Sequence, residues 1–238
     1  MSDYADDILC DFIERSAHDL RTPLTTVRGY AEGLLTVAAS PEKRERYIRI
    51  INAAAIDMDN IIEELELYGL LMAGRLEVSK EMMPLNGLFS DIRGALGRSM
   101  DKTSARPELS VADTASGTAD IYADSYLICT VTGLVIRYML QFVPDTDGRI
   151  AIGLNADNDY VYLSICDNGP VPDAGELAAI FDEHKRTGQG RIQKKNGSGL
   201  GLSIVKDIVM IYGGNITADS CGDRGMRINI ALKTMVGD

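Results

Sequence analysis

Two adjacent side chains near the start of the chain, His18 and Asp19, are the pair best suited to chemistry. Asp19 can accept a proton from the imidazole, which leaves the other ring nitrogen as a nucleophile. Thr22 follows one helical turn later on the same face, where its hydroxyl could hold a water molecule. Pro23 lacks an N–H group, so we expect the helix to loosen or bend there. These residues predict a histidine that accepts a transferred chemical group, although most exposed His–Asp pairs are only part of a solvated helix face.

A second group of residues, far along the chain, has the composition of a nucleotide site. Asp167 and Gly169 follow a predicted strand, so a carboxylate could bind an amino group where the backbone passes close by. Gly197, Gly199 and Gly201 lead directly into a predicted helix, whose N–H groups and positive end would face an anion. The stretch lacks the Gly-Lys-Ser/Thr of a Walker A loop, and it follows no strand as a dinucleotide fingerprint does. A flexible glycine loop is the alternative interpretation.

Two long helices are expected to position the histidine. The apolar residues of the first, over 6–38, form a heptad-like seam of Ile13, Ala17, Leu20, Leu24, Val27, Ala31 and Leu34, and His18 points away from it. Ser40, Pro41 and Glu42 supply a cap, a first-turn proline and a first-turn acid for a second helix. The seam of that helix comprises Tyr47, Ile51, Ala54, Met58, Ile61, Leu65, Tyr68 and Met72. One hairpin cannot bury both seams, so we expect a homodimer through residues 8–72 that forms a four-helix bundle; packing against the rest of the chain is the alternative.

The remainder of the chain mixes strands with helices after a linker expected at 74–80. We expect helices at 85–100, 124–142 and 200–212, and strands at 108–112, 118–123, 149–155, 160–166, 215–220 and 226–232. Paired strands with separate helices indicate helices on one face of a mixed sheet. We therefore predict an all-α hairpin domain over 1–75 and an α+β sandwich domain over 82–238.

Composition limits the class of protein further. The formal net charge of −11 over 238 residues argues against DNA, RNA or anionic lipid as the main partner. The four cysteines, Cys10, Cys129, Cys166 and Cys221, have no metal-ligand spacing and are expected to be reduced thiols of a cytosolic protein. The acidic start of the sequence is unlike a signal peptide, and no apolar run is long enough for a membrane span. We therefore expect a soluble, cytoplasmic protein with no membrane segment in this chain; the soluble core of a larger sensor is the alternative.

The two groups of residues resemble one family. His18 to Leu24 match the H-box of sensor histidine kinases at every position. The later segments resemble the ATP-binding domain, of the GHKL or Bergerat fold, shared by histidine kinases, Hsp90-type chaperones, type II topoisomerases and MutL-like repair proteins. Gly197 to Leu202 match the second glycine box of that domain. Asp167 and Gly169 match the first, in which Val171 replaces the second glycine. Together these resemblances cover roughly residues 8–233.

The resemblance implies a histidine kinase of a two-component system. ATP would phosphorylate His18, with Asp19 as its base, and the phosphoryl group would pass to an aspartate of a response-regulator receiver domain. Thr22 would orient water for the reverse dephosphorylation. The residues implied in nucleotide binding are Asp167, Gly169, Arg186, Gly197, Gly199, Leu200 and Gly201, with Ile180 and Phe181 as the hydrophobic box before the ATP lid.

One departure from the family lies in the helix expected at 124–142. The family's paired asparagines should fall at 134 and 138 and its lysine at 141, whereas this chain has Leu134, Tyr138 and Gln141. The asparagine matching 138 normally supplies an oxygen ligand to Mg²⁺, and a neutral phenol is a poor substitute. We therefore predict no metal ligand at 138. Two alternatives to the ATP-dependent kinase stay open: an ATP-independent histidine phosphotransferase or phosphatase, and a pseudokinase scaffold.

Overall fold

A computed structural model describes residues 2–36, 40–100, 108–113, 120–144, 146–157, 159–182 and 200–233. Over these residues the chain divides into two compact units, one that ends at Leu70 and one that begins at Leu71. The first is a helical hairpin and the second combines helices with a largely antiparallel sheet. The predicted fold class is confirmed.

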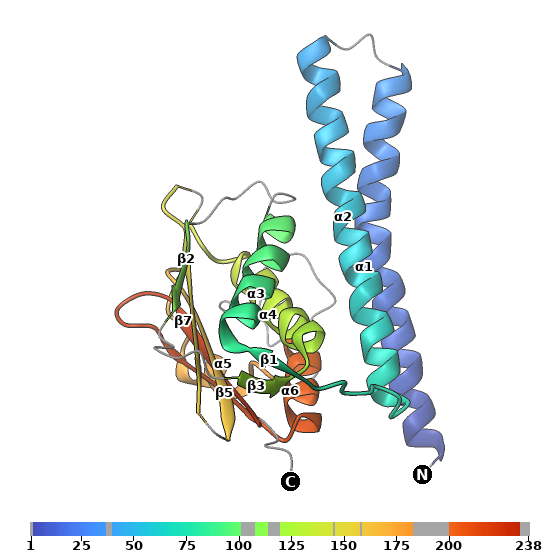
Figure 1. Cartoon of the computed structure of the whole chain (residues 1–238). Coiled ribbons are helices and arrows are strands. Elements are labelled where there is room, and N and C mark those ends of the chain that lie inside the picture. Colours follow the sequence, from blue (N-terminus) through green and yellow to red (C-terminus); the bar gives the residue numbers. More distant parts are fainter. Residues whose placement is uncertain are drawn as a thin grey trace. The chain divides into compact units, whose positions relative to one another are not determined.

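The first unit consists of α1 (Ser2–Thr36) and α2 (Pro41–Met72), which lie side by side (Figure 1). The α1 helix continues past Pro23, whose side chain is buried. Before α2, the Ser40 hydroxyl accepts a hydrogen bond from the Lys43 N–H at 3.4 Å, which is the predicted cap. A hydrogen bond from Ser40 also lowers the pKa of Glu42 in the first turn.

Close approach of the two helices near their turn depends on Gly33. A Cβ atom at this position would lie 2.9 Å from Cε2 of Tyr47, so a larger residue would force either the Tyr47 ring or the helices to shift. The Tyr47 ring meets the edge of Tyr30 with ring centroids 5.0 Å apart. Within the hairpin, Leu24 of the predicted α1 seam stays 52% exposed, while Ala54 and Ile61 of the predicted α2 seam are buried.

The second unit contains two sheets. Its elements are β1 (Glu81–Pro84), α3 (Leu85–Met100), β2 (Glu108–Asp113), β3 (Asp120–Ala123), α4 (Ser125–Met139), β4 (Arg149–Ala156), β5 (Tyr160–Asp167), α5 (Ala174–Ala179), α6 (Gly201–Ile211), β6 (Asn215–Ser220) and β7 (Met226–Lys233). The larger sheet has the strand order β2-β4-β5-β7-β6, and β1 pairs with β3 in the smaller one. The β2–β4 pair is parallel and the other pairs are antiparallel.

The core of this unit lies between the larger sheet and the helices α3, α4 and α6, which cover one of its faces (Figure 1). Burial alternates along β5, so every second side chain points into this layer. The fully buried side chains there include Leu88, Ile128, Ile152, Leu163, Ile165 and Ile204. Each contributes about 1.5–3 kcal/mol to folding by leaving water.

Helix α4 begins where the sequence predicts. Asp124 is its N-cap, and the carboxylate accepts a hydrogen bond from the Leu127 N–H at 3.0 Å. Two short elements were not expected. Strand β1 has only four residues, and α5 has only six, although the capping box of Asp173 and Glu176 at its start is a local sequence signal.

The expectation that all the cysteines are reduced is wrong for one pair. Cys166 and Cys221 are joined by a disulfide, with their Cα atoms 6.1 Å apart and a sequence separation of 55. The sheet explains the pairing, because the β6–β7 hairpin brings Cys221 back beside the end of β5. Cys129, on α4, takes no part in a disulfide.

Candidate active site

His18 lies on α1 with its imidazole largely in solvent. Its side chain is 75% exposed, whereas that of the adjacent Asp19 is only 13% exposed. The two side chains meet at 3.5 Å between Nδ1 of the ring and Oδ1 of the carboxylate. A largely shielded carboxylate on one side of the ring can hold a proton at Nδ1 and so leave Nε2 as the reactive nitrogen.

Thr22 lies one turn after His18 and is exposed. Its two threonine neighbours bond back to their own helix: Thr25 Oγ1 donates to the Arg21 carbonyl at 2.8 Å, and Thr26 Oγ1 donates to the Thr22 carbonyl at 3.3 Å. Within the described part of the chain, the Thr22 hydroxyl has no such carbonyl partner. It is therefore the threonine of this segment best placed to bind water.

Asp167 ends β5 as one of the few buried acidic residues of the second unit, with 2% of its surface exposed. Its Oδ1 accepts a hydrogen bond from the Gly169 N–H at 2.8 Å, so the two residues predicted to bind adenine are linked. A buried carboxylate is an acceptor only, which suits the amino group of a ligand.

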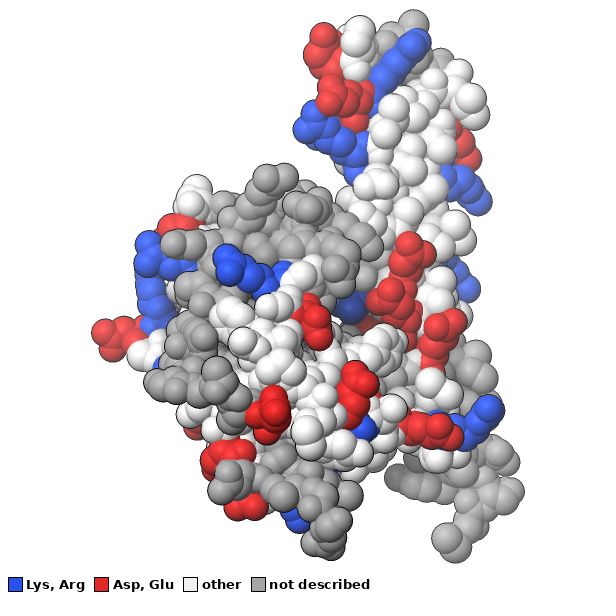
Figure 2. All heavy atoms as spheres, viewed as in Figure 1, with Lys and Arg blue, Asp and Glu red and all other residues white. Residues whose placement is uncertain are grey.

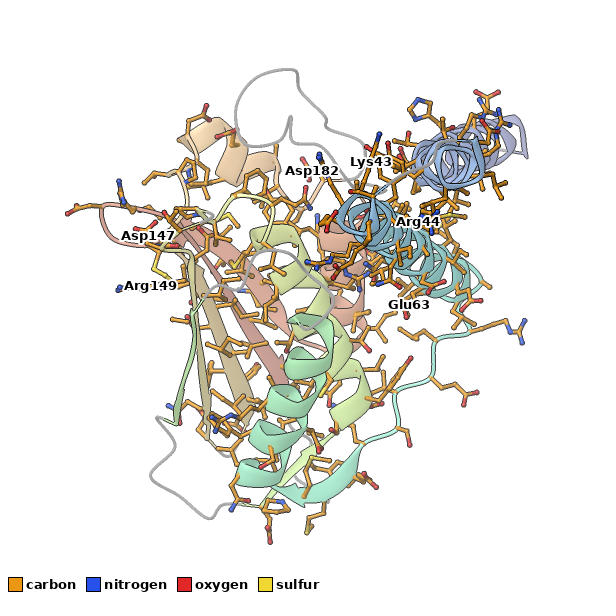
Figure 3. The ribbon with its side chains drawn as sticks, turned by 90° about the horizontal axis from the view of Figure 1, so that it is seen from above. Lys43, Arg44, Glu63, Asp147, Arg149 and Asp182 are labelled. Carbon is orange, nitrogen blue, oxygen red and sulfur yellow. A yellow bond between two sulfur atoms is a disulfide. The ribbon has the colours of Figure 1, made fainter. Side chains whose placement is uncertain are left out.

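Asn168, between them, has a structural role that sequence reasoning missed. Its Oδ1 accepts from the Arg149 N–H and its Nδ2 donates to the Asp147 carbonyl, both at 2.7 Å. Figure 3 shows Asp147 and Arg149 together at one end of the larger sheet. Asn168 therefore fixes the end of β5 to the start of β4 and holds Asp167 in place. The Asp-Asn-Gly sequence indicated a turn but not these partners.

The start of α6 is the other described part of the predicted nucleotide site. Its N-cap, Leu200, is buried and apolar, so its side chain cannot cap the N–H groups of the first turn, which begins at Gly201. Lys206, on α6, forms an ion pair of 3.9 Å with Asp182, the residue that follows the predicted hydrophobic box of Ile180 and Phe181. The predicted residues Arg186, Gly197 and Gly199 lie outside the described residues.

Three residues in or just after α4 occupy the positions that depart from the family pattern: Leu134, Tyr138 and Gln141. Leu134 is buried in the core. The Tyr138 ring packs against Phe142 with centroids 5.0 Å apart, and the Gln141 amide donates to the Arg137 carbonyl at 3.5 Å. Nowhere in the described ranges do three or more His, Cys, Asp or Glu side chains gather as metal ligands would.

The described surface carries charges of both signs. On the face drawn in Figure 2, acidic and basic residues are interspersed over both units, and both occur near the end of the hairpin at which α2 begins. Among the residues described, every helix is too short or too polar to cross a bilayer.

Comparison with protein families matches each of the two units to a known domain family. Residues 9–74 match the His Kinase A phospho-acceptor domain. Residues 125–235 match the domain described as "Histidine kinase-, DNA gyrase B-, and HSP90-like ATPase". The chain matches the catalytic core of sensor histidine kinases. In this histidine kinase core, His18 belongs to the phospho-acceptor domain, while Asp167 and the start of α6 belong to the ATPase-like domain.

Individual relatives agree with this assignment. The histidine kinase core is 26% identical over 228 residues to the sensor histidine kinase WalK of Bacillus subtilis, covering 93% of this chain and 36% of WalK. It is 24% identical over 223 residues to the sensor protein SrrB of Staphylococcus aureus, covering 93% of this chain and 37% of SrrB. The chain thus spans about a third of the length of these curated relatives.

Solved structures share the fold. The histidine kinase AdeS of Acinetobacter baumannii superposes with a TM-score of 0.60 at 18% identity, over 91% of this chain and 97% of AdeS. The histidine kinase ThkA, solved in complex with the response regulator TrrA, gives a TM-score of 0.68 at 18% identity, over 98% of this chain and 64% of that one. At these identities the likeness concerns the fold of the histidine kinase core.

Proposed function

We propose that this chain phosphorylates His18 from ATP and transfers the phosphoryl group to an aspartate of a response-regulator receiver domain. The observation that carries the proposal is the exposed His18 imidazole beside the shielded carboxylate of Asp19. A phospho-acceptor must reach a nucleotide and a partner protein in turn, so it has to project into solvent. The match of residues 9–74 to a phospho-acceptor domain supports the same role.

The proposed first step uses both ring nitrogens of His18. With a proton at Nδ1 directed toward Asp19, Nε2 carries a lone pair and attacks the γ-phosphorus of ATP. A P–N bond forms, the bond from phosphorus to the bridging oxygen breaks, and ADP leaves. The Asp19 carboxylate stabilises the positive charge that develops on the ring, and it can accept the Nδ1 proton.

In the second step an aspartate oxygen of the receiver domain attacks the phosphorus and the P–N bond breaks, which restores the imidazole. For the reverse, hydrolytic reaction, the Thr22 hydroxyl would position a water against the phospho-aspartate of the partner. The partner class is proposed by analogy with ThkA, which was solved with a response regulator.

In the proposed nucleotide site, Asp167 accepts a hydrogen bond from the adenine amino group. The N–H groups at the start of α6 and the glycine loop that includes Gly197, Gly199 and Gly201 would hold the phosphates, with Arg186 opposite them. No step is assigned to Mg²⁺, because Tyr138 and its neighbours on α4 offer no suitable ligand set. We therefore expect weak nucleotide binding and slow phosphorylation of His18.

We further propose that the hairpin acts as a homodimer through residues 8–72, in the cytoplasm. Leu24 of the α1 seam is half exposed in a single hairpin, as are Ile48 and Ile62 on α2. Pairing of two hairpins would cover such residues in a four-helix bundle.

A second candidate function is supported by Tyr138. With the metal-ligand position altered, the chain would exchange phosphate between partner proteins through His18 without using ATP. In that case the ATPase-like domain would be regulatory or structural. A scaffold without any phosphate chemistry is the third possibility, and the intact group of His18, Asp19 and Thr22 argues against it.

One experiment separates these functions. The purified chain is incubated with γ-labelled ATP and Mg²⁺, and in parallel with a receiver domain labelled at its aspartate. Acid-labile, base-stable label from ATP supports the kinase. Such label acquired only from the receiver domain supports the ATP-independent phosphotransferase. No label on His18 from either donor overturns both functions and leaves the scaffold.

A further inference from the structure

The disulfide between Cys166 and Cys221 lies on the opposite face of β5 from Asp167, the predicted adenine-binding residue. Cys166 precedes Asp167 on β5, and side chains of successive residues on a strand point to opposite faces. The buried Asp167 points toward the helix layer, so the half-buried Cys166 points to the other face of the sheet. The disulfide and the carboxylate are thus on opposite sides of one stretch of backbone.

The turn that carries Cys221 also packs against that backbone. The Cys221 N–H donates to the Gly225 carbonyl at 3.1 Å, which closes the turn between β6 and β7. Gly225 has a φ of 90°, and a Cβ atom there would overlap the Asp167 carbonyl and lie 3.1 Å from Cα of Asn168. The turn therefore lies directly against the peptide group between Asp167 and Asn168.

The sulfur of Cys166 touches the same peptide group. Its Sγ lies 3.5 Å from the Asp167 carbonyl oxygen, a distance at which a reduced thiol donates a weak hydrogen bond. A disulfide sulfur has no proton to donate. Reduction would remove the covalent link to the 221–225 turn and give Cys166 a proton that it can donate to this carbonyl.

The surroundings of Cys221 suit thiol–disulfide exchange. Nη2 of Arg227 lies 3.5 Å from its sulfur, and Arg227 is the cross-strand neighbour of Cys166 in the β5–β7 register. A guanidinium group beside a sulfur favours the thiolate, which is the attacking form in exchange reactions. Both cysteines are partly exposed, so a small reagent can reach them.

We propose that Cys166 and Cys221 form a reversible redox pair that sets the affinity of the Asp167 site for adenine nucleotides. The inference rests on the proposed nucleotide function. The oxidant is a low-molecular-weight disulfide: the Cys221 thiolate attacks one of its sulfurs and releases the first thiol. The Cys166 thiolate then attacks Cys221 and releases the second. Two protein thiols lose two electrons and two protons, and the reagent is reduced to two thiols; a dithiol reverses the reaction.

The oxidised state should bind the nucleotide more tightly. In it the end of β5 is fixed to the 221–225 turn, so Asp167 is held in its binding position before the ligand arrives. A preorganised group loses less conformational entropy when the ligand binds. We expect ADP to bind the oxidised chain about three- to tenfold more tightly than the reduced chain.

The test uses the whole chain, oxidised with oxidised glutathione or reduced with dithiothreitol, and then freed of reagent. ADP is titrated calorimetrically into each state, and the disulfide is verified by mass spectrometry after alkylation. Cys166→Ser and Cys221→Ser should each abolish the difference between the two states. Two separate variants are used so that the test remains valid if one of them fails to fold. Cys129→Ser, on α4, is the matched control and should keep the difference. Hydrogen exchange of the Gly169 amide, which donates to Asp167, reports the site without nucleotide.

The outcomes separate this inference from the proposed function. Tighter ADP binding and slower Gly169 exchange in the oxidised chain support the inference. Equal ADP affinity and equal exchange in both states overturn it and leave nucleotide binding intact. A redox-dependent Gly169 exchange without ADP binding in either state overturns the nucleotide function, and with it the proposed control of affinity.

Discussion

The backbone N–H of Asp124 donates a 2.7 Å hydrogen bond to the hydroxyl oxygen of Tyr212, 88 residues later in the chain. The Asp124 carboxylate caps α4 and also accepts from the Ser79 N–H at 2.7 Å. Lys80, next in the chain, lies 4.1 Å from the centre of the Tyr212 ring and donates to the Lys233 carbonyl. The segment that follows the hairpin is thereby tied to the start of α4 and the end of α6.

Tyr212→Phe should destabilise the second unit. The substitution leaves the buried Asp124 N–H without its acceptor, at a cost of about 1–3 kcal/mol in the free energy of unfolding. Urea denaturation at pH 7 measures it. Tyr126→Phe, at a tyrosine of α4 that is 77% exposed, is the control and should change little.

The same tyrosine predicts an alkaline pH dependence. Burial raises the pKa of Tyr212 to about 12, whereas a tyrosine in an unfolded chain titrates near 10. The folded protein holds this proton more tightly, so the stabilisation is complete below about pH 10 and disappears as the pH rises toward 12. After allowance for solvent screening, roughly 1–2 kcal/mol should be lost across this range. The difference between the unaltered chain and Tyr212→Phe should show this slope; parallel curves would contradict the assignment.

His18→Gln should abolish phosphate uptake from ATP or from a receiver domain. Because the side chain is exposed, folding and dimerisation should not change. Acid-labile label, circular dichroism and light scattering provide the three measurements. Thr25→Ala is the control and should retain labelling, because the Thr25 hydroxyl is bonded within its own helix. Label of normal intensity on His18→Gln would remove the basis of the proposed function.

Thr22→Ala should slow dephosphorylation of the receiver domain by about 10²-fold while it leaves phosphotransfer from His18 nearly unchanged. Thr25→Ala is the control, since the Thr25 hydroxyl is bonded to the Arg21 carbonyl. The two rates are followed with labelled receiver domain and labelled kinase core. Equal loss of both rates would indicate damage to the helix instead of loss of a water-binding group.

Leu24→Asp should convert a dimer into monomers. Leu24 is 52% exposed in a single hairpin, so the substitution is compatible with that fold, but a charge buried in a bundle costs several kcal/mol. Light scattering at tens of micromolar gives the mass. Met82→Asp, at an exposed methionine of β1, should remain dimeric. An unaltered chain that is monomeric at this concentration would exclude the proposed assembly.

Tyr138→Asn should make nucleotide binding depend on Mg²⁺. An amide oxygen would replace the ring that now packs on Phe142. One well-placed charge-stabilising group of this kind changes a reaction rate by about 10²–10³-fold. Calorimetry of ATP with and without Mg²⁺ tests both proteins, with Tyr126→Asn as the control. Tight, Mg²⁺-dependent ATP binding by the unaltered chain would mean that another residue replaces the missing ligand.

Elements marked by strong local signals could be predicted from sequence. Asp124 before an apolar stretch predicts the start of α4, and Gly213, with a φ of 74°, ends α6 where the glycine pair indicated. Strand β1 could not be predicted, because its four residues gain their structure from pairing with β3. Local propensity carries no information about such a distant partner.

In the candidate site, too, some features could be predicted from the sequence and others could not. The sequence placed Asp167 at a strand end, and the structure agrees. Asn168 holds that strand end through hydrogen bonds to the backbone of Arg149 and Asp147. These residues lie beside Asn168 only because β4 pairs with β5. The Cys166–Cys221 bond was missed for a similar reason, since cysteine spacing in sequence does not reveal which strands return to one another.

That bond also closes the chain into a covalent ring. The two cysteines are 55 positions apart, and the residues proposed to bind nucleotide all lie between them. A protease that cuts one peptide bond inside the ring therefore releases nothing, because the two pieces stay joined through sulfur. On a non-reducing gel the nicked protein would run as one species, and only a reducing gel would separate the fragments. Limited digestion of this domain therefore reveals a cut between Cys166 and Cys221 only after reduction.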